Sequence, residues 1–193
     1  SENAAGNLND EQVRFANTIY SAGNDLLNLI NDILDISKVE AGKLDLVPEH
    51  LSTRHVVEGM AMVFEPLAQQ KKLAFQLQVA EGVASHMVTD RQRLEQILKN
   101  LLSNALKFTS TGQITLSLER VGNDAVAFSV HDTGIGIRPE DQQGIFNAFQ
   151  QADGTTSRKY GGTGLGLSIS RDLAHLLGGS ISLASEVGQG SCF

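Results

Sequence analysis

The chain has 193 residues, of which 41% are hydrophobic and 19% charged, and its formal net charge is −7. This composition is typical of a globular protein with a buried core, and the negative charge argues against a nucleic-acid partner, whose phosphates require clustered lysine and arginine. A single cysteine, polar first residues and no long apolar run argue against a disulfide framework, a signal peptide and a membrane span, so a cytoplasmic location is expected.

A long helix is predicted from about residue 9 to residue 41, a stretch without proline. Its apolar and small residues recur in steps of three and four, the spacing of a helix that packs against other helices. We expect Asp10 to cap its start and Gly42 to end it. The apolar stripe that these residues form must be covered either by a partner helix or by the helix's own domain. The best domain boundary lies between Gly42 and Pro48, which separates residues 1–42 from 43–193.

The second part mixes strands and helices without a strict βαβ repeat. Strands are predicted at 43–47, 73–79 and 181–185, hairpins at 113–131 and at the carboxyl end, and helices at 52–70, 90–108 and 163–177. This order favours an α+β sandwich, with a mixed sheet and its helices on one face. The segment from 132 to 162 is too long for an ordinary connection and is typical of a functional loop.

Three polar residues follow one line along the helix predicted from Asp90 to Phe108. Asn100, Asn104 and Lys107 are spaced i, i+4, i+7, on the flank of the apolar stripe. Each alone would be explained as the solvated edge of the helix. Together they offer amide oxygens for a hard cation and an ammonium for phosphate, a set suited to a magnesium nucleotide.

An acidic turn follows the predicted strand 125–131. Asp132 ends the strand, and Gly134 and Gly136 allow a flat ligand to approach the backbone closely. The carboxylate could accept a hydrogen bond from an exocyclic amine such as that of adenine, although for a lone Asp-x-Gly an Asx turn at a strand end is the favoured explanation. Asp132-Thr133-Gly134 also spells the tripeptide of aspartic proteases, but those enzymes need two such carboxylates and only a homodimer could supply the second.

A glycine-rich loop precedes the last helix, in the sequence KYGGTGLGL. Glycines before a helix amino terminus expose N–H groups that bind phosphate together with the helix dipole. The spacing matches neither the Rossmann fingerprint nor the P-loop. The residues singled out here are Arg158 and Lys159 as phosphate partners, then Gly162, Thr163, Gly164, Leu165 and Gly166.

In this order, the motifs resemble those of the catalytic domain of sensor histidine kinases over nearly all of 43–193. The N-box is LEQILKNLLSNALKFT (94–109), the G1 box HDTGIGI, the F-box GIFNAF and the G2 box GGTGLGL. The resemblance implies the Bergerat nucleotide fold shared with gyrase, Hsp90 and mismatch-repair ATPases, with ATP and Mg²⁺ as ligands. Residues 138–162 would then form an ATP lid anchored by Phe146 and Phe149.

The resemblance also implies roles by position. Asn104 would ligate Mg²⁺ with Asn100 in support, Lys107 would contact phosphate, and Phe108 would lie against the nucleotide. Asp132 would bind the adenine amine, and Gly134, Gly136 and Ile137 would line the base pocket.

Asn100 bears on the type of reaction. The related ATPases hold a glutamate four residues before the magnesium-binding asparagine, where it activates water. Asparagine cannot serve as a general base, so phosphoryl transfer is the favoured hypothesis. A hydrolytic ATPase, a serine-directed kinase and a regulatory module without activity are the alternatives.

The first helix, with LINDILDISKVEAGKL, resembles the second helix of the dimerisation and phosphotransfer hairpin of these kinases, and suggests a bacterial hybrid type. None of the five histidines lies in an H-box such as His-Glu-Leu-Arg-Thr-Pro. We therefore expect the chain to bind ATP but not to phosphorylate itself. The implied partners are a hairpin with the acceptor histidine, a response regulator or receiver domain, and a second copy in the full-length homodimer.

Overall fold

The computed structural model describes residues 6–122, 125–150 and 164–193. The chain divides into two compact units, one up to Leu44 and one from Asp45 onward. None of the helices in the described ranges is long and apolar enough to cross a membrane.

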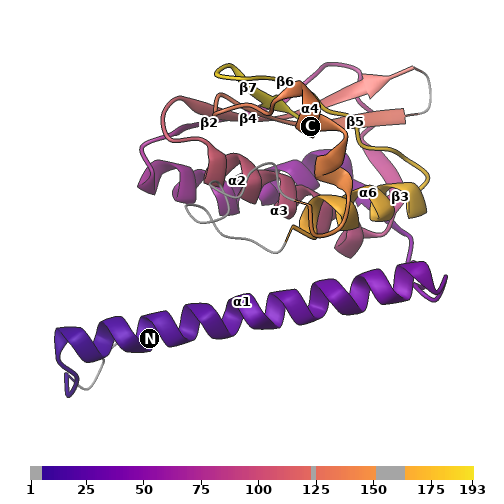
Figure 1. Cartoon of the computed structure of the whole chain (residues 1–193). Coiled ribbons are helices and arrows are strands. Elements are labelled where there is room, and N and C mark those ends of the chain that lie inside the picture. Colours follow the sequence, from indigo (N-terminus) through magenta and orange to yellow (C-terminus); the bar gives the residue numbers. More distant parts are fainter. Residues whose placement is uncertain (1–5, 123–124, 151–163) are drawn as a thin grey trace. The chain divides into compact units, whose positions relative to one another are not determined.

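The first unit is the helix α1, Asp10–Glu40 (Figure 1). Asn9, rather than the expected Asp10, caps it, because the Asn9 side chain accepts from the Gln12 N–H at 2.8 Å and Gln12 returns the bond at 2.9 Å. Asp10 instead lies in the first turn, where its charge complements the helix dipole. The helix ends as predicted before Gly42, which adopts a φ of +61°.

The apolar side chains of α1 remain largely accessible, among them Phe15, Ile19, Leu26, Ile30 and Ile33. Ile19, for example, is 72% exposed. Because a helix cannot bury an apolar stripe alone, the partner for this apolar face stays a prediction.

The second unit is built on a mixed sheet of five strands in the order β2-β4-β5-β7-β6. The strands are β2 Ala74–Val79, β4 Gln113–Val121, β5 Ala125–Asp132, β7 Gly190–Cys192 and β6 Ala184–Glu186. Only the β2–β4 pair is parallel; the others are antiparallel. On β4 the alternate residues Ile114, Leu116 and Leu118 are fully buried and mark the core face.

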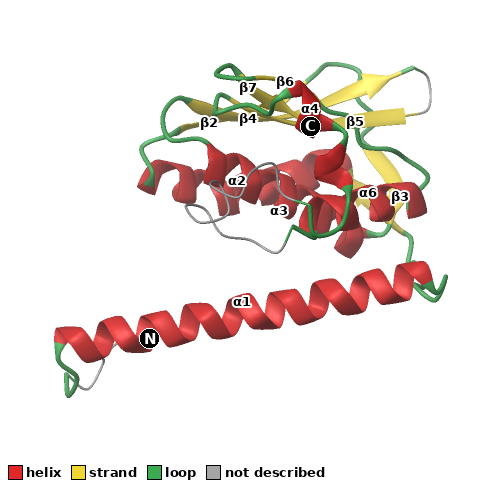
Figure 2. Cartoon of the chain, in the orientation of Figure 1, coloured by secondary structure: helices red, strands yellow, loops and turns green. Residues whose placement is uncertain are grey.

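Three helices cover that face: α2 Thr53–Gln70, α3 Arg91–Phe108 and α6 Gly166–Leu176 (Figure 2). Ser52 caps α2 and Asp90 caps α3, since each side chain accepts the N–H three residues on. Leu98, Leu102 and Leu173 from α3 and α6 are at most 1% exposed. The predicted α+β sandwich is confirmed, with helices on one side of the sheet.

The strand predicted at 43–47 is wrong. The Val47 N–H donates to the Asp90 carboxyl at 2.9 Å, and strand pairing starts only after Pro48. There β1 (Glu49–Ser52) pairs with β3 (His86–Thr89) in a separate two-stranded sheet. The strand β3 was not predicted, because four residues give too little periodicity for recognition.

Two further predictions need correction. The first strand of the final hairpin is β6, which is only three residues long and displaced towards Glu186 relative to the predicted 181–185. After β5 come two short elements, α4 Pro139–Gln142 and the 3₁₀ turn η1 Gly144–Phe146. Phe149 does not anchor this segment, because it is 70% exposed; Ile145 is the buried residue instead.

Candidate functional site

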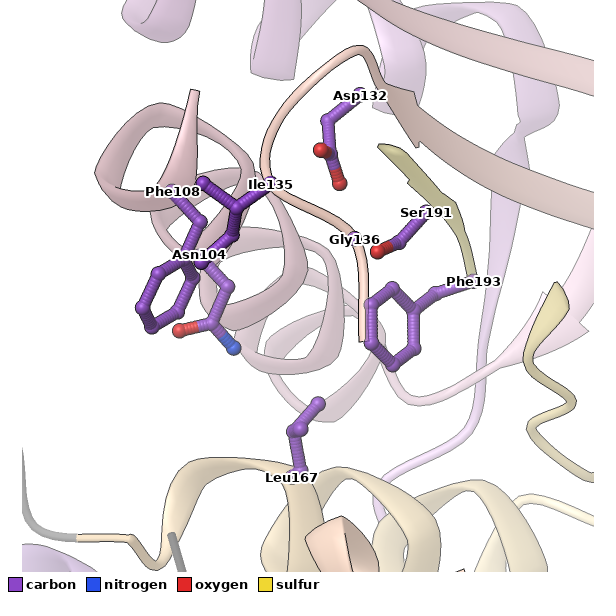
Figure 3. Close-up of a pocket in the computed structure, with 8 residues that line it drawn as sticks. All are labelled: Asn104, Phe108, Asp132, Ile135, Gly136, Leu167, Ser191 and Phe193. Carbon is purple, nitrogen blue, oxygen red and sulfur yellow. The ribbon is translucent and has the colours of Figure 1, made fainter. Parts of the chain in front are cut away.

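A pocket opens at the carboxyl ends of α3 and β5 (Figure 3). Figure 3 shows Asn104 and Phe108 side by side on one helix, with the Asp132 carboxyl and the Ser191 hydroxyl opposite them. The loop after β5 and the first turn of α6 complete the wall. The lining residues are Asn104, Phe108, Asp132, Ile135, Gly136, Leu167, Ser191 and Phe193.

The three polar residues predicted along α3, Asn100, Asn104 and Lys107, do not share one environment. Asn104 lines the pocket together with Phe108, one turn further along α3. The Lys107 ammonium lies 4.9 Å from the centre of the Phe108 ring, and partial burial lowers the pKa of this lysine. A cation that is partly desolvated interacts more strongly with an incoming anion, so Lys107 is suited to phosphate.

Asn100 faces helix α6 instead of lining the pocket. Its Nδ2 donates to the Ser170 hydroxyl at 2.9 Å. A Cβ on Gly166 would lie 2.2 Å from Asn100 Oδ1, so only glycine allows the first turn of α6 to approach this closely. Asn100 thus ties the start of α6 to α3, one turn from Asn104.

Asp132 is the buried acid of the pocket and is only 5% exposed. Burial raises the pKa of its carboxyl. Four neighbouring groups lower the same pKa without cancelling this effect: the Gly134 N–H, His131, the Ser191 N–H and the Thr109 hydroxyl. The Gly134 N–H donates to Asp132 Oδ1 at 2.8 Å, so the expected Asx turn is present. This bond orients the carboxyl and leaves its second oxygen for another donor.

The glycines of the acidic turn are required by close packing. A Cβ on Gly134 would lie 2.5 Å from the Phe108 carbonyl oxygen. Gly136 has a φ of +68°, and its Cβ would lie 2.0 Å from the Glu186 carbonyl oxygen. Ile137 does not line the pocket; its N–H donates to the Ser185 hydroxyl at 2.8 Å. These contacts hold the turn between the end of α3 and the β6–β7 hairpin.

The glycine-rich loop reaches the described structure at Gly164, which has a φ of +72°. Its carbonyl accepts the Phe149 N–H at 3.1 Å. Helix α6 begins at Gly166, and its N-cap position is Leu165, which has no polar side chain to cap the helix. First-turn amides of this kind can bind an anion. Arg158, Lys159, Gly162 and Thr163 lie outside the described residues.

Four lining residues were not singled out in the sequence: Ile135, Leu167, Ser191 and Phe193. Ile135 and Leu167 lie within the two glycine motifs and could have been found there. Ser191 reaches the pocket because β7 pairs it with Asp132, and the Phe193 ring packs edge-on against Phe146 at 6.3 Å. No local pattern indicates a pairing so distant in the sequence.

The described part of the chain contains no cluster of three histidine, cysteine, aspartate or glutamate side chains that could hold a metal. A Mg²⁺ ion that accompanies a nucleotide takes one or two protein oxygens and completes its shell with phosphate and water. Asn104 offers an amide oxygen at the pocket.

Comparison with known proteins points to one family. The family described as "Histidine kinase-, DNA gyrase B-, and HSP90-like ATPase" matches residues 89–193. Autoinducer 2 sensor kinase/phosphatase LuxQ of Vibrio cholerae is 40% identical over 96% of this chain and 22% of its own length. Hybrid signal transduction histidine kinase B of Dictyostelium discoideum is 40% identical over 96% of this chain and 10% of its own. The predicted bacterial source stays a prediction, because such relatives are not confined to bacteria.

Solved structures agree with the sequence relatives. Full-length ShkA in complex with AMPPNP superposes with a TM-score of 0.83 at 32% identity, over 96% of this chain and 38% of that one. Acinetobacter baumannii histidine kinase AdeS superposes with a TM-score of 0.76 at 28% identity, over 98% of this chain and 85% of that one. The chain spans only a tenth to about a quarter of the length of the curated relatives it matches.

Proposed function

We propose that this chain, which belongs to the histidine kinase-, DNA gyrase B-, and HSP90-like ATPase family, binds Mg-ATP and transfers its γ-phosphoryl group to a histidine outside the chain. The supporting observation is convergence: residues from three motifs far apart in the sequence line one pocket. Asn104 and Phe108 come from the N-box, Asp132 and Gly136 from the G1 box, and Leu167 from the G2 box.

The chemistry of each wall suits one part of ATP. The buried Asp132 carboxylate accepts a hydrogen bond from the exocyclic amine of adenine, and Gly136 and Phe108 line the space for the flat base. Lys107 and the amides at the start of α6 take the phosphates. ShkA was solved with AMPPNP, an analogue of ATP, which supports the same class of ligand here.

We infer that Asn104 holds the Mg²⁺ that accompanies the nucleotide, because its amide oxygen is a hard donor at the pocket and the Asp132 carboxylate is assigned to the base. When bound, such an ion neutralises phosphate charge during transfer. The remaining work of the chain is to orient the nucleotide between α3, the acidic turn and α6.

Transfer is favoured over hydrolysis by the position of Asn100. Its carboxamide is hydrogen-bonded to Ser170 on α6 and has no basic group to remove a proton from water. Without an activated water, the γ-phosphoryl group is retained for another nucleophile. All five histidines lie beyond Leu44, none of them on α1, and none has an H-box context. The phosphate-accepting histidine is therefore assigned to a segment outside this chain. From that histidine, the phosphoryl group would pass to a response regulator.

A transfer assay tests this proposal. The wild-type chain is expected to bind ADP and ATP with Mg²⁺ in calorimetry, to show no self-labelling with γ-labelled ATP, and to label an added hairpin protein that carries an H-box histidine. Phosphate release in the absence of the hairpin should stay at background. Absence of nucleotide binding, or steady phosphate release without transfer, would contradict the proposal.

The affinity for ADP is expected to fall on acidification, starting at a higher pH than for an exposed aspartate. Burial raises the pKa of Asp132, and the carboxyl must be ionised to accept the adenine amine. Protonation of the free protein therefore competes with binding as the pH drops towards the raised pKa. Calorimetry across this range measures the effect, and Asp132→Asn is the control that should abolish it. A flat wild-type profile would contradict the assigned role.

A further inference from the structure

The end of α3 carries a buried hydroxyl without a hydrogen bond. Thr109 is the C-cap residue of α3 and is 3% exposed. Its Oγ1 has no hydrogen-bond partner among the residues that the structure describes. A buried hydroxyl left unpaired costs free energy, so an atom of this kind needs an explanation.

The neighbour of this hydroxyl is the base-binding acid. Thr109 lies close enough to Asp132 to lower the pKa of the carboxyl, yet the two groups fall short of hydrogen-bond geometry. Thr109 does not line the pocket, so it stands behind Asp132 rather than beside the ligand. Any effect of the hydroxyl on a bound base must therefore pass through the carboxylate.

The carboxylate has room for this donor. Its two oxygens offer about four acceptor positions. The Gly134 N–H takes one at 2.8 Å, and the Ser191 N–H, like the Thr109 hydroxyl, lies close enough to lower the pKa of the carboxyl. Acceptor positions therefore remain for a hydroxyl from Thr109 and an amine from the base.

We propose that Thr109 is a positioning residue for the base: its hydroxyl donates to Asp132 when that carboxylate receives the exocyclic amine of adenine. The inference rests on the proposed nucleotide-binding function of the same pocket. The hydroxyl fixes the rotation of the carboxyl about its side-chain bond and aims the free oxygen at the amine. Threonine at this position thereby favours adenine over a base with a carbonyl in place of the amine.

The test compares Thr109→Val, which removes the hydroxyl and keeps the shape, with Thr109→Ser, which keeps the hydroxyl. Thr109→Val is expected to bind ADP about tenfold more weakly than the wild type. It should bind inosine diphosphate unchanged, because hypoxanthine has no exocyclic amine. Its melting temperature should be unchanged or higher, since valine removes an unpaired buried hydroxyl. Thr109→Ser should bind ADP like the wild type.

Thr53→Val is the matched control. Thr53 is 2% exposed, and its hydroxyl donates to the Ala84 carbonyl at 2.5 Å, away from the pocket. This variant should melt at a lower temperature and bind ADP normally, the reverse of Thr109→Val.

Two results would overturn the inference alone. In one, Thr109→Val binds ADP as tightly as the wild type. In the other, its affinities for ADP and inosine diphosphate fall equally and its melting temperature also falls. That combination would indicate a purely structural threonine. A wild-type chain that does not bind ADP overturns the proposed function and this inference together.

Discussion

Asp132→Asn should weaken ADP binding by about 100-fold, or roughly 2.7 kcal/mol, because hydrogen bonds to a charged acceptor are the strong ones. The amide retains one oxygen, which the Gly134 N–H at 2.8 Å already uses. Its NH₂ group would then meet the donors that now surround the second carboxylate oxygen, including the adenine amine. Calorimetry with ADP and Mg²⁺ measures the loss.

The same substitution should not lower the stability of the ligand-free protein near neutral pH. A carboxyl whose folded pKa is raised contributes stability below its unfolded pKa, and that contribution is lost as the pH rises through the folded pKa. At neutral pH the buried, ionised Asp132 therefore lowers the free energy of unfolding. An uncharged amide does not carry this cost. A large drop in the melting temperature would show that Asp132 is structural.

Asp90→Asn is the matched control for this experiment. Asp90 is also buried, at 6% exposure, but it caps α3 through the Arg93 N–H at 3.0 Å and holds the Val47 N–H. Asparagine keeps a capping oxygen for the Arg93 N–H but places its NH₂ group against the Val47 N–H. The variant should therefore lose about 1 kcal/mol of stability, from the lost Val47 bond, and leave ADP affinity unchanged. If both variants lost ADP equally, the carboxylate at 132 would have no special part in binding.

Gly136→Ala should destabilise the second unit by about 3 kcal/mol and lower its melting temperature by roughly 10 °C. The φ of +68° strains any residue with a Cβ, and this Cβ would lie 2.0 Å from the Glu186 carbonyl oxygen. The turn cannot move away freely, because the Gly188 N–H donates to the Ile135 carbonyl at 2.9 Å. Thermal unfolding followed by circular dichroism measures the loss, and ADP binding should fall with it.

Gly188→Ala separates the backbone strain of a positive φ from the steric clash that an added Cβ would make at position 136. Gly188 has a similar φ of +79°, but nothing lies within 4 Å of the Cβ position. This variant should lose only about 1 kcal/mol, from backbone strain alone. Equal losses in the two variants would mean that the contact with Glu186 contributes nothing.

The local elements of the fold were predictable from the sequence. Helices α2 and α3 begin at the predicted starts, residues 52 and 90, where Ser52 and Asp90 cap them, and the hairpin of β4 and β5 follows its predicted alternation. The reason is physical: caps, turns and the 3.6- and 2-residue periods depend on neighbours along the chain. The same reasoning placed Asn100, Asn104 and Lys107 along one line of a helix and Asp132 at a strand end.

The sequence by itself determined which residues could handle a nucleotide, because amide, ammonium, carboxylate and glycine are chemical identities. Only the tertiary structure decided which of them share a pocket. Strand pairing across the sheet brings Ser191 to Asp132, and helix packing turns Asn100 towards Ser170 on α6. Packing also buries the Thr109 hydroxyl behind the acid. These contacts join segments far apart in the chain, where no periodic signal reaches, and short strands such as β3 and β7 carry too few residues to reveal their partners.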